Sequence, residues 1–246
     1  MKRPLRIGLL AAALSGLAAL LVWGTAGLPD FGSYSGRYGR IVVHVAVSER
    51  QTANTVTATV FDIRGFDTLG EELILFAAVT GVALLLRERR EEDVPEVLDP
   101  VRSDGVRALG VTLAAAIFVL GLWVVAHGYV TPGGGFQGGV VLAAALLMLW
   151  LAGAFRPYHR LTPMPLVDAG HGAGAAAYIS IGIVALLIGE PFLHNLLPYG
   201  VSGKLSSGGS IPLLNWMTAV AVTSAFVLLF NEFLEERAFV LAERER

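Results

Sequence analysis

Long apolar runs separated by shorter polar segments dominate this sequence. A helix that crosses a bilayer needs about 20 mostly apolar residues, and several runs approach that length. They span approximately residues 5–23, 69–86, 106–126, 136–155, 173–189 and 211–230. We therefore predict an all-α integral membrane protein with about six transmembrane helices.

The composition supports a membrane protein rather than a soluble one. Of the 246 residues, 54% are apolar and 15% are charged, whereas soluble domains have about 45–50% and about 25%. Cysteine is absent, which excludes disulfide frameworks, cysteine metal sites and thiol catalysis. We expect a multi-pass protein of the cell membrane, embedded in the lipid bilayer, with no cofactor, no metal site and no nucleic-acid partner.

The distribution of Lys and Arg predicts the orientation. With six spans, both termini lie on the same side, together with 13 of the 18 basic residues. The other side holds Arg37, Arg40, Arg50, Arg64 and Lys204. By the positive-inside rule, the N and C termini are cytoplasmic.

The first run is about 19 residues long, and signal peptides have an apolar region of about 7–15. The length favours a retained anchor over a cleaved signal peptide.

A charged, proline-containing segment separates two groups of apolar runs. We predict a two-helix module at 1–88, a cytoplasmic linker at 89–104, a four-helix domain at 105–236 and a cytoplasmic tail at 237–246. Glu232 lies beyond the last apolar run, and we expect it to be solvated.

Charged residues gather where the second run begins. They are Asp62, Arg64, Asp67, Glu71 and Glu72. Charges at membrane depth cost about 2.5–3.5 kcal/mol each on insertion scales, so one interpretation is the mouth of a pathway for cations or protons. The other interpretation is structural, because Thr68 and Glu71 have the spacing of a helix capping box. That interpretation leaves Asp62, Arg64 and Glu72 unexplained.

A glycine-rich loop connects the third and fourth runs. It contains His127, Pro132, Gly133, Gly134, Gly135, Phe136, Gly138 and Gly139. Glycine permits backbone angles and close approaches that other residues do not. We therefore predict that residues 132–139 form a surface that contacts a neighbouring chain of a complex, the alternative being a flexible hairpin. His127 is a weaker candidate for the ion pathway.

Two further ionisable residues precede the fifth run. Asp168 and His171 are three residues apart, so they can pair across one helical turn and carry protons. They also lie near the predicted cytoplasmic interface. Because water solvates ionised groups there, the free-energy cost of these residues is small and a purely structural role is the alternative.

Two segments resemble a known family. Residues 130–139, Val-Thr-Pro-Gly-Gly-Gly-Phe-Gln-Gly-Gly, resemble the PGGGF-x-GG signature of the MnhB domain, a component of Mrp-type multisubunit cation/proton antiporters. The stretch 190–215 is similar to a later part of that domain. Residues 62–71, Asp-Ile-Arg-Gly-Phe-Asp-Thr-Leu-Gly-Glu, resemble a segment near the C-terminus of the largest antiporter component, equivalent to a small protein of membrane-bound hydrogenases. The chain thus looks like a fusion of the two modules.

The resemblance implies a non-enzymatic, accessory membrane component that supports Na⁺ efflux coupled to H⁺ uptake. Its partners would be the other subunits of an Mrp-type antiporter. MnhB domains often carry Gly-His-Asn before the glycine run, whereas this chain has Ala126-His127-Gly128. Two alternatives therefore stay open: a membrane component of a hydrogenase-like redox complex with an Mrp-like sodium module, or a purely structural scaffold.

Overall fold

The computed structural model describes residues 3–28, 32–33, 36–87, 101 and 103–245. It divides into two compact units, Met1–Arg40 and Ile41–Arg246. The first unit contains the 24-residue helix α1 (Arg3–Ala26), and the short helix α2 (Arg37–His44) spans the boundary. Most of the predicted linker at 89–104 lies outside the described residues.

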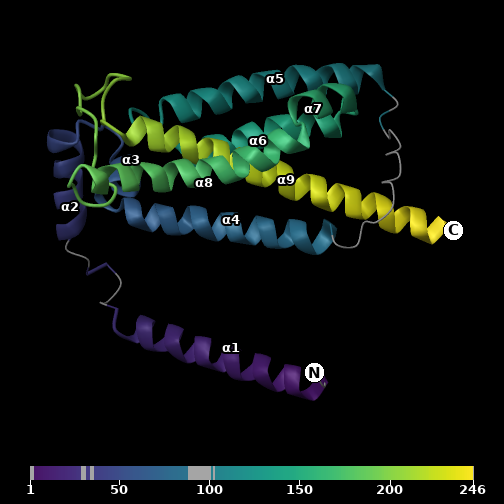
Figure 1. Ribbon diagram of the computed structural model, residues 1–246, viewed down its shortest axis with the longest axis horizontal. Coiled ribbons are helices and arrows are strands. Elements are labelled where there is room, and N and C mark those ends of the chain that lie inside the picture. The colour runs from purple at the N-terminus through teal and green to yellow at the C-terminus, as the bar shows by residue number, and fades with distance from the viewer. Residues whose placement is uncertain (1–2, 29–31, 34–35, 88–100, 102, 246) are drawn as a thin grey trace. The chain divides into compact units, whose positions relative to one another are not determined.

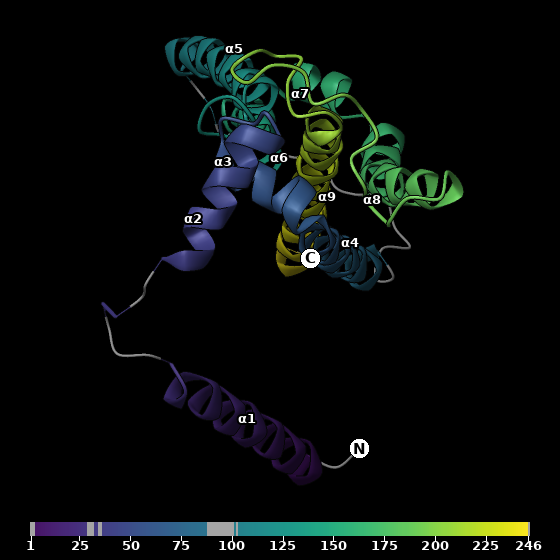
Figure 2. The same ribbon diagram turned by 90° about the vertical axis from the view of Figure 1, so that its left-hand side faces the viewer.

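The second unit is a helical bundle built around α9 (Ile211–Glu245). Four other long helices pack against α9 (Figure 1). They are α4 (Gly65–Arg87), α5 (Asp104–Ala126), α6 (Gly135–Leu151) and α8 (Met164–Leu187). Figure 2, which looks along the bundle, shows α9 between α4, α6 and α8. The described residues contain no strand.

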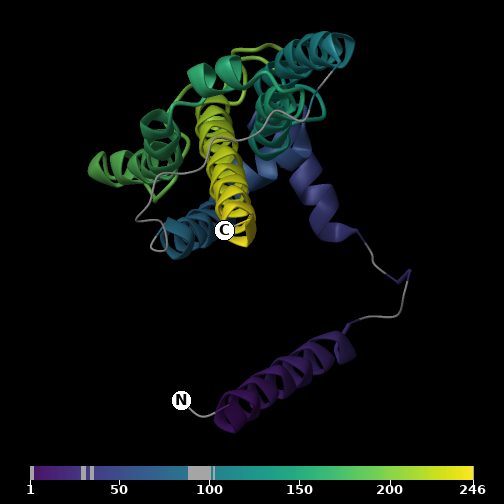
Figure 3. The ribbon, with the colours of Figure 1, turned by 90° about the vertical axis from the view of Figure 1, so that its right-hand side faces the viewer.

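Short elements occupy both ends of this bundle. One end carries the π-helical segment η1 (Val45–Glu49), α3 (Thr55–Ala58) and a second π-helical segment, η2 (Thr59–Ile63). The connection between α8 and α9 lies at the same end (Figure 1). The opposite end, which faces the viewer in Figure 3, carries α7 (Phe155–Leu161).

Local sequence explains where several helices begin. The Ser103 side chain caps α5 by accepting a hydrogen bond from the Val106 amide at 3.4 Å, and Asn54 caps α3 by accepting from the amides of Val56 and Thr57. Pro165 stands in the first turn of α8, where a missing amide hydrogen removes no helical hydrogen bond. These caps satisfy amides that would otherwise lack partners at the helix ends.

The prediction of an all-α, multi-pass membrane protein is confirmed. Five helices are long and apolar enough to cross a membrane: Ile7–Ala26, Gly65–Leu86, Asp104–Ala126, Met164–Leu187 and Ile211–Leu234. The remaining predicted span, the fourth at about 136–155, corresponds to α6, which has 17 residues. At about 1.5 Å per residue it reaches about 25 Å, the lower limit for a bilayer span.

Two helix boundaries differ from those predicted. Helix α8 begins at Met164, nine residues before the predicted start, because the polar stretch around Asp168 and His171 still packs one face against α9. Helix α9 continues to Glu245 instead of ending near residue 230. The expectation that Glu232 is solvated was wrong, since this residue is only 2% exposed.

Glycines bring the backbones of α6 and α8 close to α9. A β-carbon on Gly139 of α6 would lie 2.8 Å from Val222 Cβ, and one on Gly174 of α8 would lie 2.9 Å from the Ala221 backbone. In lipid, where helices gain little from burying apolar surface, such close van der Waals contact is a main source of helix association.

We expect Gly174→Ala to lower the stability of the bundle by about 1–3 kcal/mol, because a methyl group there overpacks the contact with Ala221. Gly172→Ala is the matched control, since a β-carbon at Gly172 meets nothing within 4 Å. The measurement is the apparent melting temperature of each variant in detergent micelles. Equal melting temperatures for the two variants would contradict this account of the α8–α9 contact.

Candidate functional site

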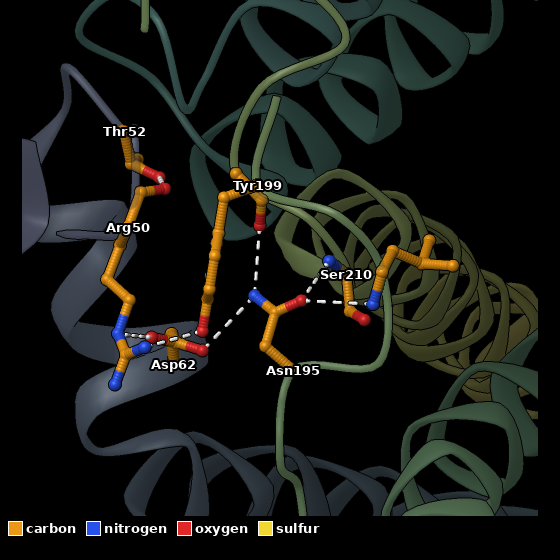
Figure 4. A network of polar contacts seen from close by, with 8 residues as sticks. Arg50, Thr52, Asp62, Asn195, Tyr199 and Ser210 are labelled. Carbon is orange, nitrogen blue, oxygen red and sulfur yellow. Dashed lines mark hydrogen bonds and ion pairs between the residues drawn. The ribbon is translucent and has the colours of Figure 1, made fainter. Parts of the chain in front are cut away.

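A polar network lies at the end of the bundle that carries η1 and η2. Arg50 follows η1, Asp62 belongs to η2, and Asn195 and Tyr199 come from the connection between α8 and α9. These segments are far apart in the sequence, and their side chains converge on the Asp62 carboxylate (Figure 4). The network therefore joins the N-terminal part of this unit to the loop before α9.

Asp62 is held by two side chains. Its Oδ2 atom forms an ion pair with Arg50 Nε at 2.7 Å, and its Oδ1 atom accepts a hydrogen bond from Asn195 Nδ2 at 3.2 Å. Arg50 also donates from Nη1 to the Tyr199 hydroxyl at 2.6 Å and lies 5.2 Å from the centre of the Tyr199 ring. The Asp62 side chain is 6% exposed and that of Arg50 is 33% exposed.

Asn195 also organises the loop in which it lies. Its Oδ1 atom accepts from the Ser210 amide at 2.7 Å, while Nδ2 donates to the Gly208 carbonyl at 3.1 Å. The Ser210 hydroxyl in turn accepts from the Leu196 amide at 2.9 Å. A β-carbon on Gly209 would collide with Asn195, and Gly209 has a φ of +61°, so glycine suits this position on both counts.

Burial and the ion pair act on Asp62 in opposite directions. Burial raises the pKa of the Asp62 carboxyl above its usual range and outweighs the lowering by Arg50 and Asn195. The ionised carboxylate is thus tolerated because Arg50 faces it. Asp62 therefore serves as an ion-pair partner in this fold, and its part in an ion pathway stays a prediction.

The predicted acidic cluster is divided between different surroundings. Arg64 and Asp67 form an exposed ion pair beside the start of α4, and Glu71 is also exposed on this helix. Glu72 points the other way and is 2% exposed. Successive helical residues are about 100° apart, so the two glutamates face different surroundings.

The capping-box interpretation of Thr68 and Glu71 was wrong. Helix α4 begins at Gly65, which places Thr68 inside its first turn rather than before it. The Thr68 hydroxyl donates to the Val60 carbonyl at 2.6 Å and ties α4 to η2. Because the π-helical segment η2 leads directly into α4, this helix begins earlier than the sequence pattern indicated.

The glycine-rich loop is packed against its own chain. Asn54 and Thr57 both donate to the Gly128 carbonyl at 2.6 Å, and Asn215 donates to the Val125 carbonyl at 2.6 Å. The β-carbon that Gly134 lacks would lie 2.6 Å from Gln137 Oε1. The loop is therefore a fixed turn rather than a flexible hairpin.

The predicted contact residues differ in their exposure. Gly134, Gly135, Gly138 and Gly139 are buried, Gly133 and Phe136 are half-buried, and Pro132 is exposed. β-carbons on Gly135 and Gly138 would collide with α9 and with α5. The buried glycines thus serve contacts within this chain, whereas a contact of Pro132 with a neighbouring chain stays a prediction.

The histidines lie in different places. His127 stacks on Trp123 with 3.7 Å between ring centres, and its Nδ1 atom lies 3.3 Å from the Trp123 carbonyl. These contacts involve none of the acidic residues of α4. His171 is buried on α8, stacks on Phe76 at 4.7 Å and lies 3.5 Å from the Thr80 hydroxyl. Asp168 is exposed one turn before His171.

Sequence reasoning missed the partners of these residues. The partner of Glu72 is Thr218, which is fully buried on α9, as is Asn215, whose side chain bonds to α5. Isolated amide and hydroxyl side chains inside an apolar run were the available signal. Arg50, Asn195 and Tyr199 lie outside the apolar runs, and only the tertiary fold shows that they meet Asp62. Further along α9, Asn231 accepts from the Tyr158 hydroxyl at 2.5 Å.

The described residues contain no group of three or more His, Asp or Glu side chains arranged to hold a metal ion. The fold and these polar sites define a class: a multi-pass helical membrane protein with buried carboxylates. Residues 105–228, half of the chain, match the family described as a domain related to the MnhB subunit of Na⁺/H⁺ antiporter. The chain belongs to this family.

Three individual proteins are similar to this chain, and two of them are antiporter components. An uncharacterized protein of Methanocaldococcus jannaschii is 29% identical over 75% of this chain and 80% of its own length. The B component of the Na⁺/H⁺ antiporter of Bacillus subtilis is 25% identical over 47% of this chain and 84% of that protein. The A/B component of a probable K⁺/H⁺ antiporter of Rhizobium meliloti is 29% identical over 68% of this chain, but only 19% of that longer protein is covered.

Two solved structures have similar chains. One belongs to the membrane-bound sulfane sulfur reductase, an archaeal respiratory membrane complex, with a TM-score of 0.67, 29% identity and coverage of 94% of this chain and 98% of that one. The other belongs to the Mrp complex from Dietzia sp. DQ12-45-1b, with a TM-score of 0.65 and 23% identity over 94% of this chain and 26% of that one. The second likeness concerns the fold alone.

Arg50→Ala tests the ion pair at Asp62. The variant leaves a buried carboxylate without its counterion, which destabilises a protein by about 3–5 kcal/mol when both groups are buried and by less here, since Arg50 is partly exposed. Because burial already raises the pKa of Asp62, protonation relieves the cost. The deficit should be small at acidic pH and grow as pH rises through the pKa of Asp62.

The measurement is the apparent melting temperature of wild type and Arg50→Ala across this pH range. Adding Asp62→Asn to Arg50→Ala removes the unpaired charge and should recover most of the loss at neutral pH. A melting-temperature difference that does not change with pH would show that the ion pair is not the source of the effect.

Proposed function

We propose that this chain is an accessory membrane subunit of an Mrp-type multisubunit cation/proton antiporter, supporting Na⁺ efflux coupled to H⁺ uptake. The observation that carries the proposal is the match of residues 105–228 to the MnhB-related family. The antiporter proteins among its relatives support the same assignment. In this proposal the chain performs no reaction of its own, and its partners are the other subunits of the complex.

The surface of α4 supports a role beside other subunits. Asp67 and Glu71 are exposed near one end of a helix that otherwise presents apolar residues. Carboxylates facing hydrocarbon are costly, so such residues usually face water or protein. We propose that they border an ion pathway shared with a neighbouring chain, at the end of α4 that our orientation places outside the cell.

A second candidate function is supported by the structural comparison. The similar chain in the sulfane sulfur reductase complex is covered over 98% of its length, so the two chains correspond almost end to end. On this alternative, the chain is a membrane component of a respiratory redox complex, and electron transfer takes place in other subunits. Affinity purification from native membranes distinguishes the candidates, because redox proteins co-purify only in the second case.

The purified chain alone should not exchange ions. We expect proteoliposomes with imposed Na⁺ and H⁺ gradients to show no exchange above empty vesicles, whereas the purified complex in the same lipids exchanges Na⁺ for H⁺. The assay follows internal pH with a fluorescent dye. Robust exchange by the isolated chain would contradict an accessory role, and an inactive but intact complex would contradict the antiporter assignment.

A further inference from the structure

The carboxylate of Glu72 is enclosed within the membrane-spanning bundle. Glu72 lies in the second turn of α4 and is 2% exposed. Its Oε1 atom has no hydrogen-bond partner. This position is unlike that of the neighbouring Glu71, which is exposed, and unlike that of Asp62, which has an arginine partner.

Helix α9 presents polar but uncharged groups to this carboxylate. The Thr218 hydroxyl faces Glu72, and Thr218 Oγ1 has no hydrogen-bond partner of regular geometry. Asn215, one turn earlier on α9, points elsewhere, since its Nδ2 atom donates to the Val125 carbonyl of α5. Two buried oxygen atoms with unused hydrogen-bonding capacity, Glu72 Oε1 and Thr218 Oγ1, therefore occur where α4 meets α9.

The other described elements bring no positive charge to Glu72. On α8, the Tyr178 ring packs nearby, and its hydroxyl already donates to the Gly65 carbonyl at 2.9 Å. On α4 itself, Glu71 is the neighbouring ionisable group, and it adds negative charge. Among the described residues, the titratable groups near Glu72 are thus Tyr178, which packs beside it, and Glu71, which adjoins it along α4, and neither is a cation.

Burial without a counterion decides between the two states of the carboxyl group. An ionised carboxylate in a low-dielectric interior loses its hydration, and no Lys, Arg or His among the described residues faces it to compensate for the loss. The neutral acid avoids that penalty, and its hydroxyl can donate to the Thr218 oxygen. A bound proton thus neutralises the charge of the Glu72 carboxylate and gives the unpartnered Thr218 oxygen a hydrogen-bond donor.

We propose that Glu72 is a proton-binding site at the junction of α4 and α9, which takes up and releases a proton during turnover of the complex. The exchange during turnover rests on the proposed antiporter function, whereas the binding of the proton does not. Thr218 is the positioning residue, because its hydroxyl sets the hydrogen bonding of the acid.

The glycine-rich signature takes part in this junction. A β-carbon on Gly135, the first residue of α6, would lie 2.8 Å from Thr218 Cβ. Thr218 is therefore in contact with α6 on one side and faces Glu72 on the other. The site therefore lies where the N-terminal module, which contains α4, meets the four-helix domain, which contains α6 and α9.

Infrared spectroscopy of the whole purified complex tests proton binding without any transport assay. A protonated carboxylic acid has its own C=O stretching band, which shifts in D₂O and disappears on ionisation. We expect the wild-type spectrum at neutral pH to contain such a band that is missing in Glu72→Gln and retained in Glu71→Gln. A band unchanged in Glu72→Gln would overturn the proposal.

Thr218 gives a second spectroscopic test, independent of replacing the acid. Thr218→Val keeps the shape of the side chain but removes the hydroxyl, so the C=O band of Glu72 should shift in frequency. Thr218→Ser keeps the hydroxyl and should leave the band in place. Identical spectra for Thr218→Val and wild type would show that Thr218 does not position the acid.

Transport by the reconstituted complex tests proton exchange. Glu72→Gln preserves shape and neutrality, so we expect an assembled complex whose exchange rate falls at least about tenfold, given that proton-transfer groups typically contribute on the order of 10²–10⁴-fold. Glu72→Asp retains an acid and should keep more activity than Glu72→Gln, with an altered pH profile. Wild-type exchange in Glu72→Gln would overturn the exchange step, whereas an inactive wild-type complex would instead count against the antiporter function.

Discussion

The close contact of α9 with its neighbours is the constraint on which the rest of the structure depends. Lipid gives helices little reason to associate through apolar surface alone, and α9 is held where glycines of α6 and α8 let backbones approach. This approach fixes the face of α9 that carries Asn215 and Thr218. The side of α4 that carries Glu72 packs against α9 beside Thr218.

The polar residues fall into two arrangements that treat charge in different ways. At the end of the bundle, the Asp62 carboxylate has Arg50 as a partner, and the pair fastens the loop before α9. Further inside, Glu72 meets only neutral side chains and another acid among the described residues. The first arrangement suits a permanent charge that stabilises the fold. The second suits a group whose charge changes.

Much of the fold was predictable because apolar length is a strong constraint in membranes. The six runs identified the long helices, and the sequence at 130–139 indicated the family. Helix α8 began earlier than predicted, since Asp168 and His171 interrupt the apolar run without interrupting the helix. The short π-helical segment η2 left no periodic pattern, so the start of α4 and the role of Thr68 were misjudged.

The candidate site was less predictable than the fold. The residues on α4 were visible as charges in an apolar context, but their partners were not. Asn195 meets Asp62 across 133 positions of sequence, and Thr218 meets Glu72 across a similar separation. Which of two adjacent glutamates faces inward depends on the rotation of α4, and that rotation is set by packing against α9 rather than by local sequence.

The packing of α4 against α9 also has a consequence for assembly. The two helices belong to one polypeptide, so every copy of α9 is made with one copy of α4, and their ratio cannot drift with expression. Because the contact is intramolecular, α4 reaches α9 without a bimolecular encounter. A junction built from two separate chains would have to form by collision in the membrane. Here both helices are encoded together, so the ratio of one α4 to one α9 is fixed by synthesis.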